Sequence, residues 1–298
     1  MTDHARGWLA LWFGAEVVLL FLVSWVGADV LGLHHDLYLL VYFTIALSFL
    51  ATFIARTGVD WRAYLRANLV PSLALGTVVA VLSVMNVLRH DSTPRPTGAY
   101  FGFELAWRGL AYGVVDALML YAFPALVASL LLRGGAAGRW RALAVPVVAL
   151  ALVLTATTAY HLGYRQFRDE DLREPVTGAV IMSAPVLLTA NPAGAVLAHA
   201  SVHVAALAHE AQGGNYLPPA PAGHPERLSG PAGLAVAGGW LALTAVIWWR
   251  GRRWFLGPAS STTTALTTTA LTTTGPTTTG PTTTGQTTTG LEHRGRAN

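Results

Sequence analysis

The sequence lacks two residue types that carry much of protein chemistry, cysteine and lysine, and it has little charge of either sign. Without cysteine there can be no disulfide, no thiolate catalysis and no cysteine-ligated metal. Charged residues are 11% of the 298 residues, whereas soluble domains usually carry about 25%. The net charge of +4 comes from arginines that mostly flank apolar runs. That position is typical of membrane orientation signals, so we do not expect nucleic-acid binding.

Long apolar runs dominate the sequence, of which 53% is hydrophobic. The runs are roughly 17–25 residues long, the length that crosses a bilayer core as a helix. We therefore predict an all-α, polytopic transmembrane bundle of about eight spans, with the lipid bilayer as its partner. The predicted spans are residues 8–27, 37–55, 69–88, 101–132, 141–161, 176–190, 193–209 and 231–250. The fourth run is too long for one straight crossing, and Asn191-Pro192 predicts a tight turn between the sixth and seventh.

The predicted domains are a transmembrane helical domain over residues 1–256 and a low-complexity tail over 257–298. Residues 262–291 are six copies of a TTTxx repeat. Threonine and glycine bury too little apolar surface to offset the entropy of ordering, so we expect a disordered tail.

Arginine placement predicts the orientation. With a cytoplasmic N-terminus, the inner flanks of the spans hold ten arginines and the outer loops six. This bias agrees with the positive-inside rule. The absence of lysine beside abundant arginine, alanine and glycine suggests a GC-rich bacterial gene. We therefore expect a multi-pass protein of the bacterial cytoplasmic membrane with both termini in the cytoplasm.

A few ionisable side chains lie inside the predicted spans, where each costs about 2.5–3.5 kcal/mol on insertion scales. They are Glu16, Glu104, Arg108, Asp116, His161, His199 and His203. Glu104 and Arg108 are four residues apart and share one helix face, which Tyr112 and Asp116 continue. His199 and His203 have the same spacing and can hold one metal ion or one substrate group.

In the predicted topology, Glu104, Arg108, His161 and His203 fall at a similar depth toward the outer leaflet. His199 lies one turn deeper. A carboxylate and several imidazoles shielded from bulk water can activate a water molecule and stabilise an oxyanion. The pattern predicts one water-accessible pocket that these side chains share.

Three short motifs in this order resemble those of the CPBP intramembrane proteases, the glutamic-type family related to CAAX-prenyl protease 2. The matching segments are residues 103–109 (FELAWRG), 157–161 (TTAYH) and 199–203 (HASVH). The resemblance covers about residues 100–210 and includes the helix placement. Phe103 stands where the family has the first glutamate of its pair, Thr157 replaces a phenylalanine, and His203 replaces an asparagine.

The resemblance implies hydrolysis of a peptide bond in a membrane-embedded peptide substrate, with no cofactor. It implies catalytic roles for Glu104, Arg108, His161, His199 and His203. Glu104, assisted by His161, would deprotonate the attacking water, and Arg108 would keep Glu104 ionised. His199 and His203 would orient the water and polarise the scissile carbonyl.

Two alternatives remain open. Thr157-x-x-x-His161, Asp116 and His199-x-x-x-His203 loosely resemble the residue set of ceramidase-like hydrolases, which implies a zinc-dependent membrane hydrolase with zinc on His161, His199 and His203. The other is a catalytically inactive scaffold that binds a partner helix or a lipid, which the apolar Phe103 favours.

Overall fold

The computed structural model describes residues 3–92, 98–133, 139–169 and 172–209, together with the isolated residues 239 and 242. The described segments are helical and contain no strand. The predicted eighth span and the threonine-rich tail lie outside the described residues, apart from positions 239 and 242.

The helices follow the apolar runs of the sequence. The first part of the chain forms α1 (Asp3–Ser24), η1 (Trp25–Val30), α2 (His35–Thr57), α3 (Trp61–Arg66) and α4 (Leu69–Val87). Next come α5 (Ala99–Glu104), η2 (Leu105–Ala111), α6 (Tyr112–Ala117), η3 (Leu118–Ala122) and α7 (Phe123–Leu131). The described chain then forms α8 (Arg139–Leu162), α9 (Arg165–Asp169), α10 (Arg173–Thr189) and α11 (Ala193–His209).

Five of these helical stretches are long and apolar enough to cross a membrane, which indicates a helical membrane protein. They are His4–Val30, His35–Thr57, Leu69–Val87, Ala99–Leu131 and Ala142–Leu162. Ala193–His209 is apolar but shorter.

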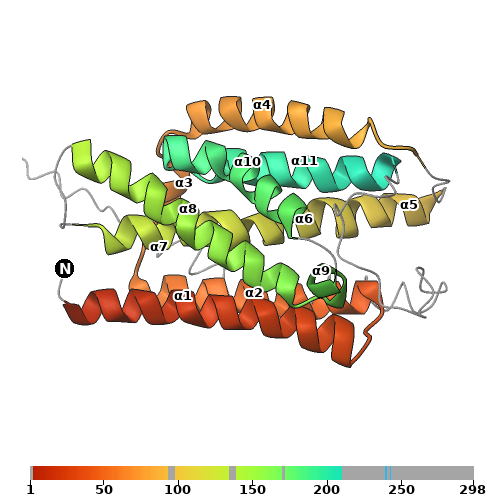
Figure 1. Ribbon diagram of the computed structural model, residues 1–298, viewed down its shortest axis with the longest axis horizontal. Helices are drawn as coiled ribbons and strands as arrows, with labels where there is room; N and C mark the ends of the chain where they lie inside the picture. Colours follow the sequence, from red (N-terminus) through yellow and green to blue (C-terminus); the bar gives the residue numbers. More distant parts are fainter. Residues whose placement is uncertain are drawn as a thin grey trace, which may run out of the picture. The chain divides into compact units, whose positions relative to one another are not determined.

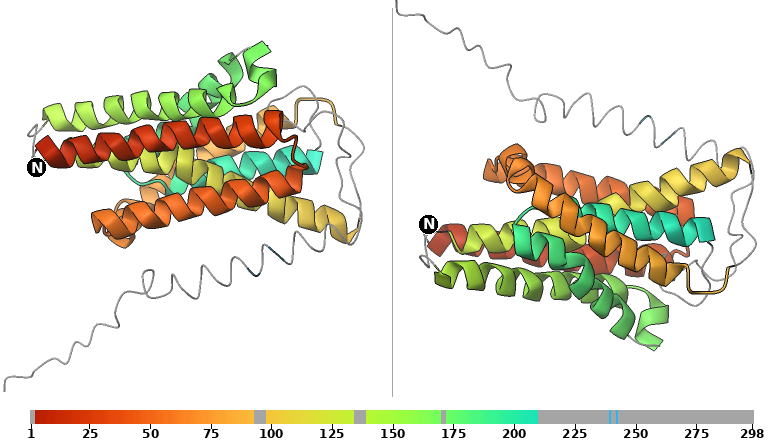
Figure 2. Two further views of the ribbon diagram at one scale, coloured as in Figure 1. Left: turned by 90° about the horizontal axis from the view of Figure 1, so that it is seen from below. Right: turned by 90° about the horizontal axis from the view of Figure 1, so that it is seen from above.

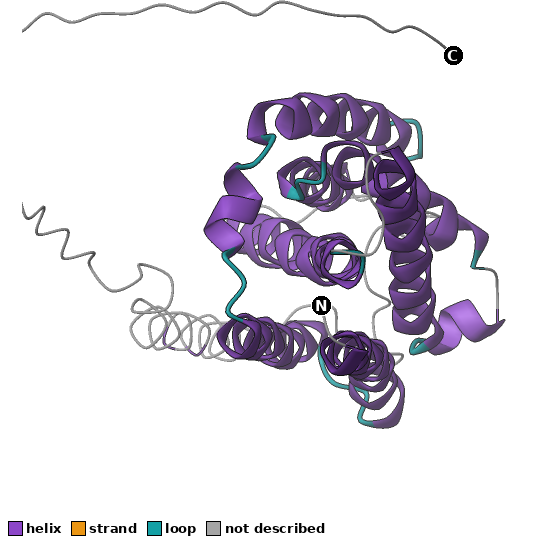
Figure 3. Ribbon diagram, turned by 90° about the vertical axis from the view of Figure 1, so that its left-hand side faces the viewer, coloured by secondary structure: helices purple, strands orange, loops and turns teal. Residues whose placement is uncertain are grey.

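Residues 99–131 form the centre of the bundle. This stretch is one helix of 33 residues, and 72% of its most apolar window is buried, against 22–33% for the other four. In Figure 1, α4 lies on one side of the bundle and α1 and α2 on the other, with this central helix and α11 between them. Figure 2 shows the same arrangement from two further sides, and Figure 3 looks along the helices.

Two π-helical segments, η2 and η3, interrupt the central helix. A π turn inserts an extra residue without ending the helix, so the predicted fourth span stays one continuous helix. Gly109 lies within η2 and Gly113 just beyond it. Segments of this kind often occur at functional sites because they reorient the side chains that follow.

Glycines allow α11 to pack closely on two neighbours. A Cβ on Gly76 of α4 would lie 2.4 Å from the Cα of Gly194. A Cβ on Gly113 would lie 2.6 Å from the Cα of Ala200. Without side chains at these points the backbones come into contact, as is common between membrane helices.

The turn predicted at Asn191-Pro192 joins α10 and α11. The Asn191 amide donates hydrogen bonds to the carbonyls of Leu65 and Ala67, at 2.7 and 2.5 Å. The Ser72 hydroxyl donates to the Asn191 carbonyl at 2.8 Å and accepts from the Gly194 amide at 2.9 Å. These bonds fix the start of α11, and therefore the height of its histidines in the bundle.

Candidate functional site

The candidate site lies where α11 packs against the central helix in the opposite direction. His199 faces Asp116, His203 faces Tyr112, and Leu207 lies beside Gly109. His199 and His203 are one turn apart, so both point at the same stretch of the central helix. Because Gly113 has no side chain, α11 approaches closely enough for both histidines to reach the central helix.

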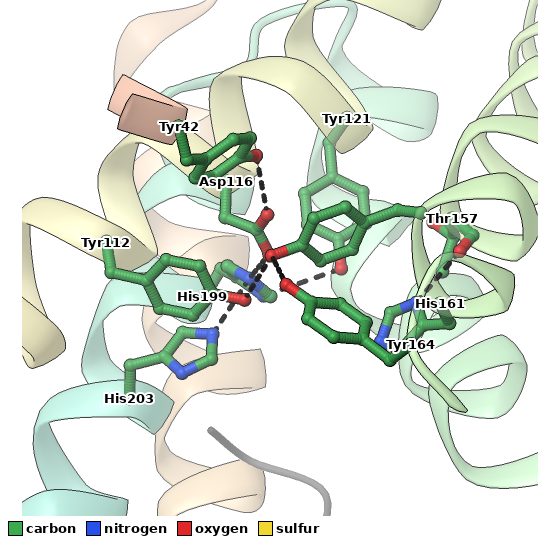
Figure 4. A network of polar contacts seen from close by, with 10 residues as sticks. Tyr42, Tyr112, Asp116, Tyr121, Thr157, His161, Tyr164, His199 and His203 are labelled. Atoms are coloured by element: carbon green, nitrogen blue, oxygen red, sulfur yellow. Dashed lines mark hydrogen bonds and ion pairs between the residues drawn. The ribbon is translucent and has the colours of Figure 1, made fainter. Parts of the chain in front are cut away.

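Three side chains converge here, and we call Asp116, His199 and His203 the histidine cluster (Figure 4). The Nε2 atom of His199 is 2.9 Å from Oδ2 of Asp116 and 3.0 Å from Nε2 of His203. One ligand atom from each residue lies within 4.8 Å of the others. Asp116 and His203 are only 2% and 5% exposed, and His199 is partly buried.

The hydrogen bonding inside the cluster favours a bound cation. His199 Nε2 carries at most one proton, yet it contacts both a carboxylate oxygen and another imidazole nitrogen. If His199 Nε2 donates its proton to Asp116, it has no lone pair left to accept a hydrogen bond from His203. If it accepts a hydrogen bond from His203 instead, it has no proton to donate to the carboxylate of Asp116. A metal ion between the three atoms would accept an electron pair from each.

The spacing of the atoms also suits zinc. Tetrahedral zinc with bonds of about 2.0–2.1 Å places its ligand atoms roughly 3.3–3.4 Å apart. The contacts at 2.9 and 3.0 Å are a few tenths of an ångström shorter than this, and the third pair, Asp116 and His203, lies within 4.8 Å. Side-chain rotations that open the first two contacts would admit the ion. Nitrogen and oxygen donors are ordinary zinc ligands.

Two tyrosines orient the cluster from outside. The Tyr42 hydroxyl donates to Oδ1 of Asp116 at 2.9 Å, which leaves Oδ2 facing the histidines. The Tyr121 hydroxyl is 3.4 Å from Nδ1 of His199, on the far side of that ring. Metal-ligating histidines and carboxylates commonly have such outer partners, which fix the ring orientation and the tautomer.

Glu104 and Arg108 belong to a different group, which we call the arginine cluster. Arg108 donates from Nε and Nη2 to the two oxygens of Asp36, at 2.7 and 2.9 Å. Its Nη1 donates to Glu104 at 3.1 Å. All three side chains are buried. Twelve residues separate Glu104 from Asp116, so these two carboxylates start roughly 15–18 Å apart along the helix.

His161 is placed separately from both clusters. Its Nδ1 is 2.8 Å from the carbonyl of Thr157, and its ring packs edge-on against Tyr160 and Phe167. It is not among the residues whose ligand atoms converge in the described part of the chain. Glu16 lies on α1, fully buried, and neither of its carboxylate oxygens has a hydrogen-bond partner among the described residues.

The five side chains expected in one pocket are thus divided. The structure brings His199 and His203 together and adds Asp116, which the sequence placed on the polar ridge of the central helix. It pairs Glu104 with Arg108 as their spacing suggested. Sequence reasoning missed Asp36, Tyr42 and Tyr121. The signal for Asp36 was available, since a buried arginine in a membrane needs more than one acceptor.

No family model, curated protein or solved structure matches this chain.

Proposed function

We propose that this chain is a metal-dependent integral membrane hydrolase whose ion is held by Asp116, His199 and His203. The observation that carries this proposal is the convergence of three ligand atoms, from the buried Asp116 and His203 and the partly buried His199, within 4.8 Å of one another. Three protein ligands with one open position for water are typical of catalytic zinc. Compared with the zinc site that the sequence suggested, Asp116 takes the place of His161, whose Nδ1 already contacts a backbone carbonyl.

The chain's own residues would hold and orient the reactants. A bound zinc ion supplies a water of lowered pKa and polarises a carbonyl. Tyr42 holds the carboxylate of Asp116 in its ligating orientation. Tyr112 packs edge-on against His203, with ring centroids 4.7 Å apart, so its hydroxyl lies at the border of the site. A phenol in that position can donate a hydrogen bond to a developing oxyanion.

The depth of the site indicates the class of substrate. Asp116 lies midway along a helix long and apolar enough to span a membrane, and both Asp116 and His203 are buried. A substrate must therefore present its scissile bond from within the bilayer, as the amide or ester of a lipid or of a membrane-embedded peptide.

Metal analysis tests the proposal. Protein purified after growth with zinc should contain an equimolar amount of it, and His203→Ala should lose it. The matched control is His161→Ala, which removes an imidazole from the same bundle and should retain the metal. Zinc-free wild-type protein would refute the site, and loss of zinc in His161→Ala would favour the set with His161. Hydrolysis should then be measured on membrane peptides and N-acyl lipids, comparing the wild type with His203→Ala.

A second candidate is the glutamic-type peptidase. It is favoured by the buried contact of 3.1 Å between Arg108 and Glu104, since an arginine keeps a catalytic glutamate ionised. Under this hypothesis Glu104→Gln abolishes cleavage of a transmembrane peptide while expression persists. Normal cleavage by Glu104→Gln would exclude it. Absence of both metal and cleavage in the wild type would leave the scaffold hypothesis.

A further inference from the structure

Charge is divided unevenly between the two ends of the helical bundle. At the end where α1 begins, which we call the basic end, the acids among the described residues are Asp3 and Asp60. The arginines described at this end are Arg6, Arg56, Arg62, Arg66, Arg133, Arg139 and Arg141. At the opposite end, acids accompany the arginines, since Arg168 pairs with Asp29 and Arg165 with Asp169. The basic end therefore has a clear excess of positive charge.

One apolar cluster holds the helix ends together at the basic end. Leu9 of α1, Phe53 of α2 and Leu130 of α7 are buried in it, and Tyr64 of α3 packs against it. The Tyr64 hydroxyl is buried and has no hydrogen-bond partner among the described residues. In both views of Figure 2, α3 lies toward the end of the bundle that carries the N-terminus. The arginines of these four elements therefore share one surface.

The short helix α3 has one inward and one basic face. Arg62 and Arg66 are four residues apart and share a face, whereas Tyr64 lies about half a turn away from both. Because the Tyr64 ring packs against the apolar cluster, the two arginines lie on the side of α3 that faces away from it. Arg66 is exposed.

Hydrogen bonds fix both ends of α3. The Asp60 carboxylate accepts from the Ala63 amide at 2.9 Å, which caps the first turn. The Asn191 side chain occupies carbonyls at the end of α3, and the Asn68 side chain donates to the Thr189 carbonyl at 2.8 Å. The arginines of α3 are therefore presented by an ordered element, and little entropy is lost when they meet a ligand.

Three arginines of the basic end have side chains that are available to a ligand. Arg56, in the last turn of α2, Arg66 and Arg133, just after α7, are all exposed. Within the described ranges, none of the three forms an ion pair or a side-chain hydrogen bond. Asp60, the acid nearest to Arg66 in the sequence, is already engaged in capping α3.

The position of these arginines along the spans indicates the ligand. The helix α3 joins two helices that are long and apolar enough to cross a membrane, His35–Thr57 and Leu69–Val87. A segment between two spans lies at the membrane surface, at the level of the lipid headgroups. A guanidinium donates two parallel hydrogen bonds to a phosphate, and each basic residue beside an anionic leaflet strengthens binding about fivefold.

We propose that the basic end binds anionic phospholipids, and that Arg56, Arg66 and Arg133 contact the phosphates of their headgroups. The excess positive charge selects anionic over zwitterionic lipids, and the fixed position of α3 holds Arg66 at headgroup level. This surface is separate from the histidine cluster, so the inference is independent of metal binding.

Native mass spectrometry of the full-length protein tests the proposal. The protein is released from dodecyl maltoside micelles that contain equal amounts of phosphatidylglycerol and phosphatidylcholine, and the bound lipids are counted by mass. The variants are Arg66→Gln and the double variant Arg56→Gln/Arg66→Gln, which remove exposed charges without changing the packed core. The matched control is Arg89→Gln, because Arg89 is an exposed arginine beyond the end of α4, at the opposite end of the bundle.

The wild type should retain phosphatidylglycerol in preference to phosphatidylcholine. Its affinity for phosphatidylglycerol should fall about fivefold in Arg66→Gln and roughly 25-fold in the double variant, and should stay within about twofold in Arg89→Gln. High salt should remove the preference, because exposed charges are screened. Equal retention of the two lipids by the wild type would overturn the proposal, as would equal losses in Arg66→Gln and Arg89→Gln.

The water-soluble headgroup, glycerol phosphate, distinguishes a lipid from a free phosphate. A bound lipid also keeps its acyl chains against the apolar sides of the helices, so millimolar glycerol phosphate should not displace it. Full displacement would mean that the basic end takes soluble phosphates, and the lipid assignment would be wrong.

Discussion

The central helix carries two polar clusters, and they compensate the charge of a buried carboxylate in different ways. In the arginine cluster, three guanidinium nitrogens each point at a separate carboxylate oxygen of Asp36 or Glu104. In the histidine cluster, a single nitrogen of His199 is shared between Asp116 and His203. The first cluster supplies its own cation, whereas the second contains a carboxylate without a permanent positive charge beside it.

The difference indicates what each cluster is for. A planar guanidinium matches a carboxylate with two parallel hydrogen bonds, so Arg108 and Asp36 form a neutral pair without any added ion. A buried carboxylate and two imidazoles are complete only after a proton or a metal ion has been added. We therefore expect the arginine cluster to stabilise the fold and the histidine cluster to bind, and the following variants can break or sharpen that contrast.

Arg108→Met should have the largest effect on stability. It leaves Asp36, which is fully buried, without its two strongest hydrogen bonds. Removing one partner of a buried ion pair costs about 3–5 kcal/mol. Unfolding in detergent, followed by circular dichroism, measures the loss. The control Arg165→Met breaks an exposed pair with Asp169 and should cost less than about 1 kcal/mol. Equal losses in the two variants would contradict a structural role for the arginine cluster.

Tyr42→Phe should have the next largest effect, and on metal affinity rather than on stability. It removes the hydroxyl that holds Oδ1 of Asp116. Loss of such an outer partner typically weakens metal binding about 10–100-fold. Competition for zinc with a chelating dye measures the affinity, with Tyr64→Phe as the control. If Tyr42→Phe binds zinc as tightly as the wild type, Asp116 is not a ligand.

Glu104→Gln should be milder. The amide oxygen of glutamine can still accept the hydrogen bond from Arg108. Only the contribution of the carboxylate charge to that bond is lost, which costs about 1 kcal/mol of stability. The zinc content should not change, because Glu104 belongs to the arginine cluster. The same unfolding and metal measurements apply. Loss of zinc in this variant would show that the two clusters are coupled.

The sequence alone predicted much of the helical architecture, because bilayer-length apolar runs are a strong signal. The turn at Asn191-Pro192 and the excess length of the fourth run were both visible in it. The two π segments of the central helix were not visible in the sequence, since they depend on packing rather than on composition. Nor could the sequence show that Gly76 meets Gly194, because that contact depends on the fold.

The site was predictable only within single helices. Helical spacing correctly placed His199 beside His203 and Glu104 beside Arg108. It could not fix how far α11 is shifted along the central helix. His203 lies opposite Tyr112 and Leu207 beside Gly109, so the level of Glu104 falls beyond the last described turn of α11. From the sequence, the depth of each residue is estimated from the end of its predicted span. That estimate grouped residues that lie at different levels once α11 is packed against the central helix.

Tyr121→Phe should have the smallest effect and gives the finest comparison within the histidine cluster. Its hydroxyl is 3.4 Å from Nδ1 of His199, a longer contact than the 2.9 Å between Tyr42 and Asp116. A hydrogen bond that long is weak, and its loss should cost about 0.5 kcal/mol, or roughly twofold in zinc affinity. The chelator competition that serves for Tyr42→Phe resolves this difference. A loss as large as that of Tyr42→Phe would mean that the tautomer of His199, more than the orientation of Asp116, controls metal binding.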